Sequence, residues 1–120
     1  MPLTQKAENR HMSTDAIRLG LLAPLSGIVS IYGQDIARAG QIATSLVNDK
    51  GGLLGRKLEL VIADDGSLPE TAVPAAKRLV HEDGCIAIIG NLLSNSRIAV
   101  SDQVSVPSRI PYLNFSFYEG

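Results

Sequence analysis

Short apolar runs alternate along this chain with longer stretches in which apolar residues recur every three or four positions. Runs of the first kind predict buried strands, and spacing of the second kind predicts amphipathic helices. Three helices are expected between four strands, and the order βαβαβαβ predicts an α/β fold with a parallel sheet and right-handed crossovers. The four strands are predicted over residues 17–23, 57–65, 85–90 and 109–115.

Local signals mark where the first two helices begin and end. The first is predicted over residues 34–49, and Gly51 and Gly52 follow it as a left-handed cap. Ser67 and Glu70 have the spacing of a capping box at the start of the second helix. The apolar faces predicted for the two helices are Ile36, Ala39, Gly40, Ala43, Leu46 and Val47, then Ala72, Ala76, Leu79 and Val80.

Two prolines interrupt the helical patterns. Pro74 lies one turn inside the second helix, so this helix is expected either to kink or to start late. The third helix is predicted over residues 94–106 and is expected to end at Pro107.

Composition limits the classes of function. The chain has 120 residues, enough for one domain with a single core, and 45% of them are apolar. The net charge of −1 and the absence of tryptophan argue against nucleic-acid binding and against electrostatic attachment to a membrane. No apolar run is long enough to span a bilayer. The polar residues 1–16 are expected to form a disordered lead-in.

Motifs for common enzymes are missing from the sequence. There is no G-x-G-x-x-G or phosphate-binding loop after the first strand, and no G-x-S-x-G segment. Asp64 and Asp65 could suggest a metal site of the receiver type, but the next strand ends in Gly90 and Asn91 rather than in an acid. We therefore interpret the two aspartates as turn residues, and we expect no enzyme, no metal and no cofactor. The single cysteine, Cys85, is predicted to be a buried apolar residue.

The candidate site lies where the strands end, because ligands of open parallel sheets bind at the carboxyl edge near a topological switch point. The loop after the third strand, GNLLSNSR, is rich in small hydrogen-bonding groups. Ser94 and Ser96 are placed at a helix start, where a hydroxyl and backbone N–H groups suit a carboxylate or amide oxygen. Ordinary helix capping by one serine is the alternative. With Ser94 as the candidate ligand contact, Asn95 and Ser96 are interpreted as helix-start residues and Arg97 as part of the first exposed turn.

Four segments together resemble a known family. The stretch from residue 17 to 73 has the order strand, PLSG loop, helix, N-x-x-GG-x-x-G-R turn and D-D strand end. The segments AIIGNLLSNSRIAV, RIPYLNFS and FYEG continue the likeness. Over residues 16–120 the chain resembles the N-terminal lobe of type I periplasmic binding proteins. More narrowly, it resembles the branched-chain amino acid and amide receptors of ABC transporters and a related cytoplasmic amide sensor.

The resemblance implies a three-layer Rossmann-like lobe and a set of ligand contacts. Ser94 falls on the serine that binds the ligand carboxylate or amide, and Ser116 falls on a contact after the fourth strand. Tyr32 falls on an aromatic residue that covers the ligand. Tyr118 belongs to the Tyr-Glu-Gly segment at the cleft edge, and Asn114 is a neighbouring candidate. The alternative for both tyrosines is ordinary surface packing.

The chain departs from the family in two respects. Leu92 stands where the amide sensor has an aromatic ligand contact, so the ligand preferences are expected to differ. Family members have two lobes, and residues 17–120 are expected to be a partial N-terminal lobe with the second lobe absent. Such a lobe would expose a sheet edge and apolar surface, so we expect self-association.

Two functions follow from the resemblance. The first is a solute-binding receptor lobe for a branched-chain amino acid, a short amide or a urea-like ligand, working with an ABC transporter permease in the periplasm. The alternative is a sensory module for amides or amino acids, cytoplasmic or linked to a receptor, that regulates a partner. A third class, an enzymatic α/β domain of receiver or nucleotide-binding type, would require metal or nucleotide binding.

Overall fold

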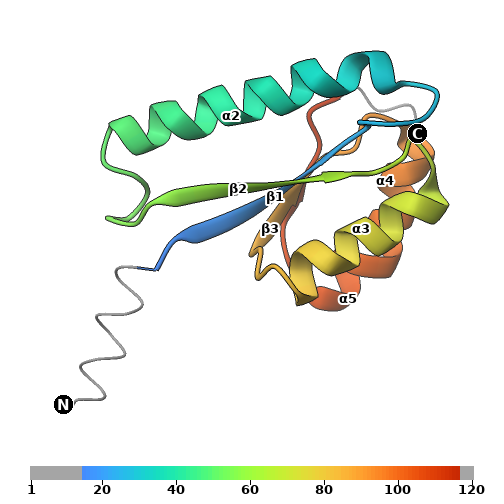
Figure 1. The fold of residues 1–120 in the computed structure, drawn as a ribbon. Helices are drawn as coiled ribbons and strands as arrows, with labels where there is room; N and C mark the ends of the chain where they lie inside the picture. The colour runs from blue at the N-terminus through green and yellow to red at the C-terminus, as the bar shows by residue number, and fades with distance from the viewer. Residues whose placement is uncertain (1–14, 117–120) are drawn as a thin grey trace.

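The computed structural model describes residues 15–116, and in it the chain forms four parallel strands with helices on both faces of the sheet (Figure 1). The predicted α/β class and three-layer arrangement are confirmed. The elements are β1 (Ile17–Ala23), η1 (Ser30–Tyr32, a 3₁₀ turn), α2 (Gly33–Asp49), β2 (Leu58–Asp64), α3 (Pro69–His81), β3 (Ala87–Ile89), α4 (Ser94–Val100), η2 (Ser101–Ser105, π-helical), α5 (Val106–Ser108) and β4 (Tyr112–Leu113).

The strand order β2-β1-β3-β4 places a topological switch point between β1 and β3. The chain leaves β1 through α2 to reach β2 on one side, and then crosses through α3 to β3 on the other side. The register pairs Ala23 with Asp64 and Leu21 with Ile89, so β1, β2 and β3 end close to the same edge. This edge is where ligands bind in open parallel sheets.

The closed core lies between the sheet and the layer formed by α3, α4 and η2. The predicted face of α3 is confirmed: Ala72, Ala76 and Leu79 are fully buried, and Val80 packs against them. Cys85 is also buried, as expected. The main apolar partners are Leu22, Ala63, Val73, Ala75, Ile88, Val100 and Val104.

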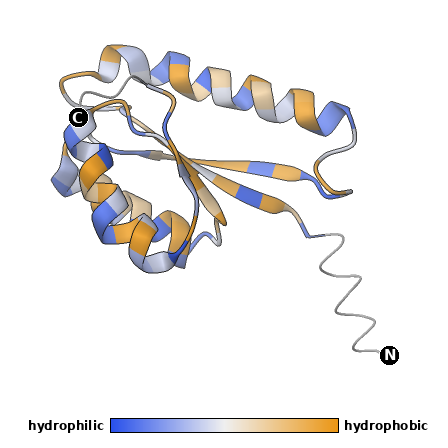
Figure 2. Cartoon of the chain, turned by 180° about the vertical axis from the view of Figure 1, so that it is seen from behind, coloured by the Kyte–Doolittle hydropathy of each residue, from blue (hydrophilic) through white to orange (hydrophobic). Residues whose placement is uncertain are grey.

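Within residues 15–116, the opposite face of the sheet is covered only in part, by α2. Hydrophobic and hydrophilic segments alternate along this helix (Figure 2), yet only Gly33 and Ala37 are buried in it. Of the predicted apolar face only Leu46 points elsewhere, being 56% exposed. The other five positions line an open apolar groove of about 420 Å³ against the sheet. We call it the α2 groove, and its other lining residues are Leu19, Leu21, Thr44, Leu58, Leu60, Ile89 and Phe115.

The predicted capping box at the start of α3 is wrong. The residue before the helix is Leu68, no side chain caps the helix, and Ser67 has a φ of 63°. The Ser67 hydroxyl donates instead to the Ser26 carbonyl over 2.7 Å. The hydrogen bond between Ser67 and the loop after β1 therefore takes the place of the helix cap that the local sequence predicts. The helix also continues through Pro74. The carbonyl that loses its partner belongs to Glu70, which is exposed and accessible to water.

The third helix is longer than predicted, and two strands are shorter. Pro107 lies in the first turn of α5, where a proline is tolerated, and the helical path ends at Arg109 with a φ of 56°. The π-helical η2 joins α4 to α5. The strand predicted over 109–115 is paired only at Tyr112–Leu113, which lie opposite Ile88 and Ile89 of the short strand β3. The strand predicted over 85–90 is reduced to Ala87–Ile89.

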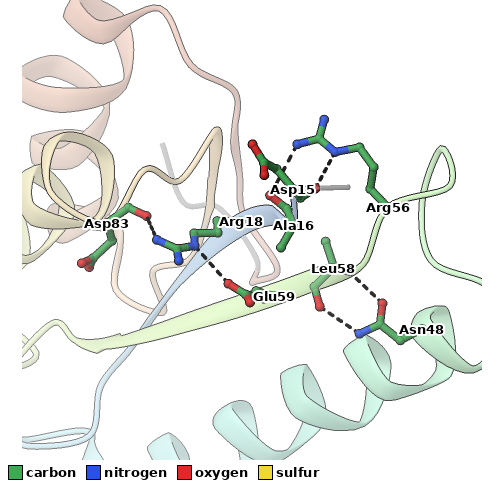
Figure 3. A network of polar contacts seen from close by, with 8 residues as sticks. All are labelled: Asp15, Ala16, Arg18, Asn48, Arg56, Leu58, Glu59 and Asp83. Carbon is green, nitrogen blue, oxygen red and sulfur yellow. Dashed lines mark hydrogen bonds and ion pairs between the residues drawn. The ribbon is translucent and has the colours of Figure 1, made fainter. Parts of the chain in front are cut away.

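A polar network ties the amino end of the sheet together (Figure 3). The Asn48 amide brackets Leu58: its Nδ2 donates to the Leu58 carbonyl and its Oδ1 accepts the Leu58 N–H, each over 2.8 Å. Gly52, with a φ of 84°, brings the chain so close to the Arg56 carbonyl that a Cβ would lie 2.1 Å from that oxygen. The asparagine and the glycine of the N-x-x-GG turn therefore serve the link between α2 and β2.

Arg18 forms the other part of this network. Its Nε is 3.0 Å from the Glu59 carboxylate on β2. A second nitrogen donates to the Asp83 carbonyl over 2.9 Å, in the turn that leads to β3 (Figure 3). Both side chains of the ion pair are more than two-fifths exposed, so the pair contributes little to stability beyond orienting the strands.

Candidate functional site

The candidate site is the carboxyl edge of the sheet, where the loops after β1, β3 and β4 emerge. Its first wall is the loop after β1, which the Asp64 carboxylate organises. Asp64 Oδ1 accepts the N–H groups of Leu25, Ser26 and Gly66 over 2.9, 3.1 and 2.8 Å. Its Oδ2 accepts the Ser26 hydroxyl over 2.6 Å. Burial alone would raise the pKa of Asp64, but these hydrogen bonds outweigh it and lower the pKa below its ordinary value.

Ser67 holds the same loop from the other side, since its hydroxyl also accepts the Val29 N–H over 3.4 Å. The loop fixed in this way presents large apolar side chains to solvent. Ile28 is 84% exposed and Ile31 is 80% exposed. Tyr32, a predicted ligand contact, ends η1 next to the start of α2 and is 55% exposed. An organised loop with exposed apolar groups can provide an apolar wall for a ligand.

The second wall is the loop after β3. Gly90 has a φ of 150°, and a Cβ there would lie 2.7 Å from the Leu22 carbonyl oxygen, so only glycine fits. Ser94 is the first residue of α4 and is half-buried. Asn95 is exposed, and its Oδ1 accepts the Ser96 N–H over 2.8 Å, which agrees with a role at the helix start. Ser96 is fully buried, so it does not line an open site.

The expectation for Arg97 is wrong. It was placed in an exposed first turn, but only 3% of it is exposed. It lies on the side of α4 that faces a polar groove shared with Tyr112 and Asn114. The helical pattern could not show this, because the burial of Arg97 depends on the position of β4, which follows it in the chain.

The remaining predicted residues follow β4. Asn114 is exposed at the strand end, and its Nδ2 donates to the Gly90 carbonyl, so its amide holds the loop that leads to Ser94. Ser116 is half-buried, and the preceding Phe115 turns toward the α2 groove. Tyr118 lies outside the described residues. The topology thus brings Tyr32, Ser94, Asn114 and Ser116 to one edge of the sheet.

Sequence reasoning missed a buried row of polar groups beneath this edge, which we call the edge triad: Asp65, Asn91 and Tyr112. Asn91 Nδ2 donates to Asp65 Oδ2 over 2.7 Å, and the Tyr112 hydroxyl donates to Asn91 Oδ1. Burial, opposed in part by hydrogen bonding to Asn114 and Asn91, raises the pKa of Tyr112 to about 12. The sequence does place polar residues, Asp65 and Asn91, at the ends of two predicted strands. We interpreted Asp65 as a turn residue and therefore did not connect it with Asn91.

Within residues 15–116 no cluster of three or more His, Cys, Asp or Glu side chains could hold a metal ion. The two aspartates are occupied by loop N–H groups and by an amide, which extends the turn interpretation. Over the same residues, no helix has both the length and the apolar character needed to cross a membrane.

The chain is similar to known proteins in both sequence and fold. The family model for periplasmic binding proteins matches residues 16–120. The Leu/Ile/Val-binding protein BraC3 of Rhizobium johnstonii is 42% identical over 86 residues, which make up 72% of this chain and 23% of that protein. The chain therefore spans about a quarter of the length of such relatives.

Solved structures lead to the same family. The structure of a putative branched-chain amino acid ABC transporter protein from Silicibacter pomeroyi is 32% identical, with a TM-score of 0.75, over 83% of this chain and 25% of that one. An isoleucine-bound substrate-binding protein from Streptococcus pneumoniae has a TM-score of 0.81 over 88% of this chain and 30% of that one. At 23% identity the second structure supports the fold alone.

These relatives carry binding or transport names, so the sensory alternative gains no support from them. The prediction of a binding protein rather than an enzyme is confirmed at the level of the family. With its parallel 2-1-3-4 sheet and a match over residues 16–120, this chain belongs to the periplasmic binding protein family.

Proposed function

We propose that this chain is the first ligand-binding lobe of a solute receptor that serves an ABC transporter permease in the periplasm. The ligand class is a small polar solute with an aliphatic part, such as a branched-chain amino acid, a short amide or a urea-like compound. The observation that carries the proposal is the placement of Ser94. It begins α4 at the topological switch point, half-buried, between the loops after β1 and β4.

The proposed roles follow from the chemistry of each group. The Ser94 hydroxyl donates to the carboxylate or carbonyl oxygen of the ligand, and Ser116 supports the same polar head. Tyr32 packs on the aliphatic part, next to the exposed Ile28 and Ile31. Asn114 contributes through its hold on Gly90. Tyr118 is proposed from the family resemblance only.

In a receptor with two lobes, a ligand held between them favours the closed state because it contacts both. We therefore propose that residues 17–120 act as a partial N-terminal lobe. This chain offers one wall of the cleft, and a bound ligand stays largely in contact with water. For the 120-residue chain we expect dissociation constants of about 1 mM or weaker.

The test is titration of the ¹⁵N-labelled chain with L-leucine, L-valine, acetamide and urea, followed by NMR. At least one ligand should shift the resonances of residues 90–97, and Ser94→Ala should weaken that response several-fold. Asn95→Ala is the matched control, since this neighbouring side chain is exposed and bonds only within the helix start. Absence of any response at these residues would contradict the proposed site. Sub-micromolar binding by calorimetry would contradict the one-walled cleft.

We also propose that the chain self-associates. In the sheet formed by the described residues, β2 and β4 are the edge strands, and the α2 groove leaves apolar side chains of the sheet accessible. Exposed edges and apolar grooves promote contact between copies. A dilution series followed by light scattering should show a mass that rises with concentration, and a monomer throughout the series would disprove this proposal.

A further inference from the structure

The edge triad spans the sheet at the height of the candidate site. Asp65 follows β2 and is 2% exposed, Asn91 follows β3 and is fully buried, and Tyr112 belongs to β4. β1 lies between β2 and β3, and its last carbonyl, that of Ala23, accepts the Asp65 N–H over 2.9 Å. All four strand ends are therefore connected in one hydrogen-bonded row beneath the loops that surround the site.

The chemistry of the row permits one orientation of the central amide. The Asp65 carboxylate can only accept, so it requires the Asn91 NH₂ group. The Tyr112 hydroxyl donates, so it requires the Asn91 carbonyl oxygen. A rotated amide would place two acceptors against each other at Asp65. Both neighbours thus select the same orientation, and hydrogen bonds in such a buried chain strengthen one another.

This row fixes the loop that carries Ser94. At one end of the loop the Gly90 carbonyl accepts the Asn114 amide, and at the other the Leu93 carbonyl accepts the Arg97 N–H over 3.0 Å as the helix begins. Asn91 is anchored between these points. We propose that Asn91 is a positioning residue for ligand binding, which sets the place of the Ser94 hydroxyl through loop 90–93. This inference rests on the proposed function of Ser94.

Stability alone is a weak reason for a row of this kind. Removing a carboxylate and an amide from water is costly, and apolar side chains of similar volume commonly fill such a space as well or better. With apolar side chains in the row, loop 90–93 would adopt several packing arrangements. The polar row restricts it to one, which is what a hydroxyl aimed at a ligand requires.

The first test is Asn91→Asp, with L-leucine as the probe and ¹⁵N NMR titration as the measurement. The new carboxyl faces Asp65, and two carboxyls at this separation hold a shared proton far more readily than one alone. At pH 5 the protonated group donates to Asp65 as the amide did, and leucine affinity should equal that of the parent. At pH 8 both carboxyls lose their protons, the loop is released, and affinity should fall about tenfold. The parent should change less than twofold.

The second test exchanges the partners, as Asp65→Asn combined with Asn91→Asp. The central carboxylate then accepts from the amide at position 65 and from Tyr112, and the amide oxygen still accepts the Ser67 N–H that bonds Asp65 over 2.8 Å. Leucine affinity should return to the parent value at pH 8 and should lose its pH dependence. The other ionisable groups beside the row are the Tyr112 phenol and the Arg97 guanidinium. With its pKa raised to about 12, the Tyr112 phenol stays protonated between pH 5 and 8.

The outcomes separate this proposal from the proposed function. If the parent responds to leucine but Asn91→Asp binds equally at both pH values, or if the exchange fails to restore binding, the positioning role is wrong. If the parent responds to none of L-leucine, L-valine, acetamide and urea, the function of Ser94 fails first; if it responds to one of the others but not to leucine, that ligand replaces leucine as the probe. Should Asn91→Asp not fold at pH 8, Tyr112→Phe removes one of the two hydrogen bonds to the amide. It should then weaken leucine binding about threefold, and unchanged affinity would overturn the proposal.

Discussion

At the scale of single residues, Asp64 shows how one carboxylate can order a whole loop. Three backbone N–H groups and one hydroxyl converge on it. Because these bonds favour the charged form, the pKa is lowered from its ordinary 3.8 despite burial. A lowered pKa means stabilisation that is present above pH 3.8 and is lost as pH falls through the folded-state value.

Asp64→Asn should therefore destabilise the fold at pH 7 and have a smaller effect in acid. The side chain is partly exposed, so the expected loss is only about 1 kcal/mol. Urea unfolding at pH 7 and pH 3 measures it, and the difference from the parent should shrink at pH 3. Asp49→Asn, on an exposed residue at the end of α2, is the control. A destabilisation equal at the two pH values would show that the carboxylate charge does not hold the loop.

At the scale of elements, sequence patterns correctly predicted the features that depend on residues close together in the chain. The buried face of α3 and the start of α2 near residue 34 follow from helical spacing. Ser67 and Arg97 escaped prediction because their partners, Ser26 and the β4 region, are distant in sequence. The carboxyl-edge location proposed for the site follows from topology alone. The edge triad does not, since it depends on which strand ends become neighbours.

Asn48 links two elements, α2 and β2, and its substitution has a clear expected effect on stability. Its amide satisfies both the N–H and the carbonyl of Leu58, at the point where the chain enters β2 from the turn after α2. Asn48→Ala leaves both backbone groups without this partner in a partly buried place, and should cost about 2 kcal/mol of unfolding free energy. Thermal and urea unfolding measure the loss. Ser45→Ala, on an exposed position of the same helix, is the control and should be near neutral.

An Asn48→Ala variant as stable as the parent would mean that the N-x-x-GG turn holds its shape without the side chain. Asn48→Asp is informative beside it. The carboxylate still accepts the Leu58 N–H but can no longer donate to the Leu58 carbonyl, so an intermediate loss is expected. If stability falls in the order parent, Asn48→Asp, Asn48→Ala, both hydrogen bonds between Asn48 and Leu58 contribute. Figure 3 shows these two bonds.

At the scale of the whole molecule, the two faces of the sheet are unequal. Among the described residues, α3, α4 and η2 cover one face and α2 covers the other (Figure 1). The α2 groove stays open between α2 and the sheet. If copies associate through this groove, Ala43→Glu should keep the chain monomeric, because Ala43 lines the groove yet is exposed in the single chain. The new charge stays hydrated in the monomer and would be buried without a partner on association. Light scattering over a dilution series should show a constant monomer mass, with unfolding free energy unchanged within about 0.5 kcal/mol.

Gln41→Glu adds the same charge to the same helix away from the groove, and should associate like the parent. Equal association of both variants would place the contact elsewhere, with the β2 and β4 edges as the remaining candidate surfaces.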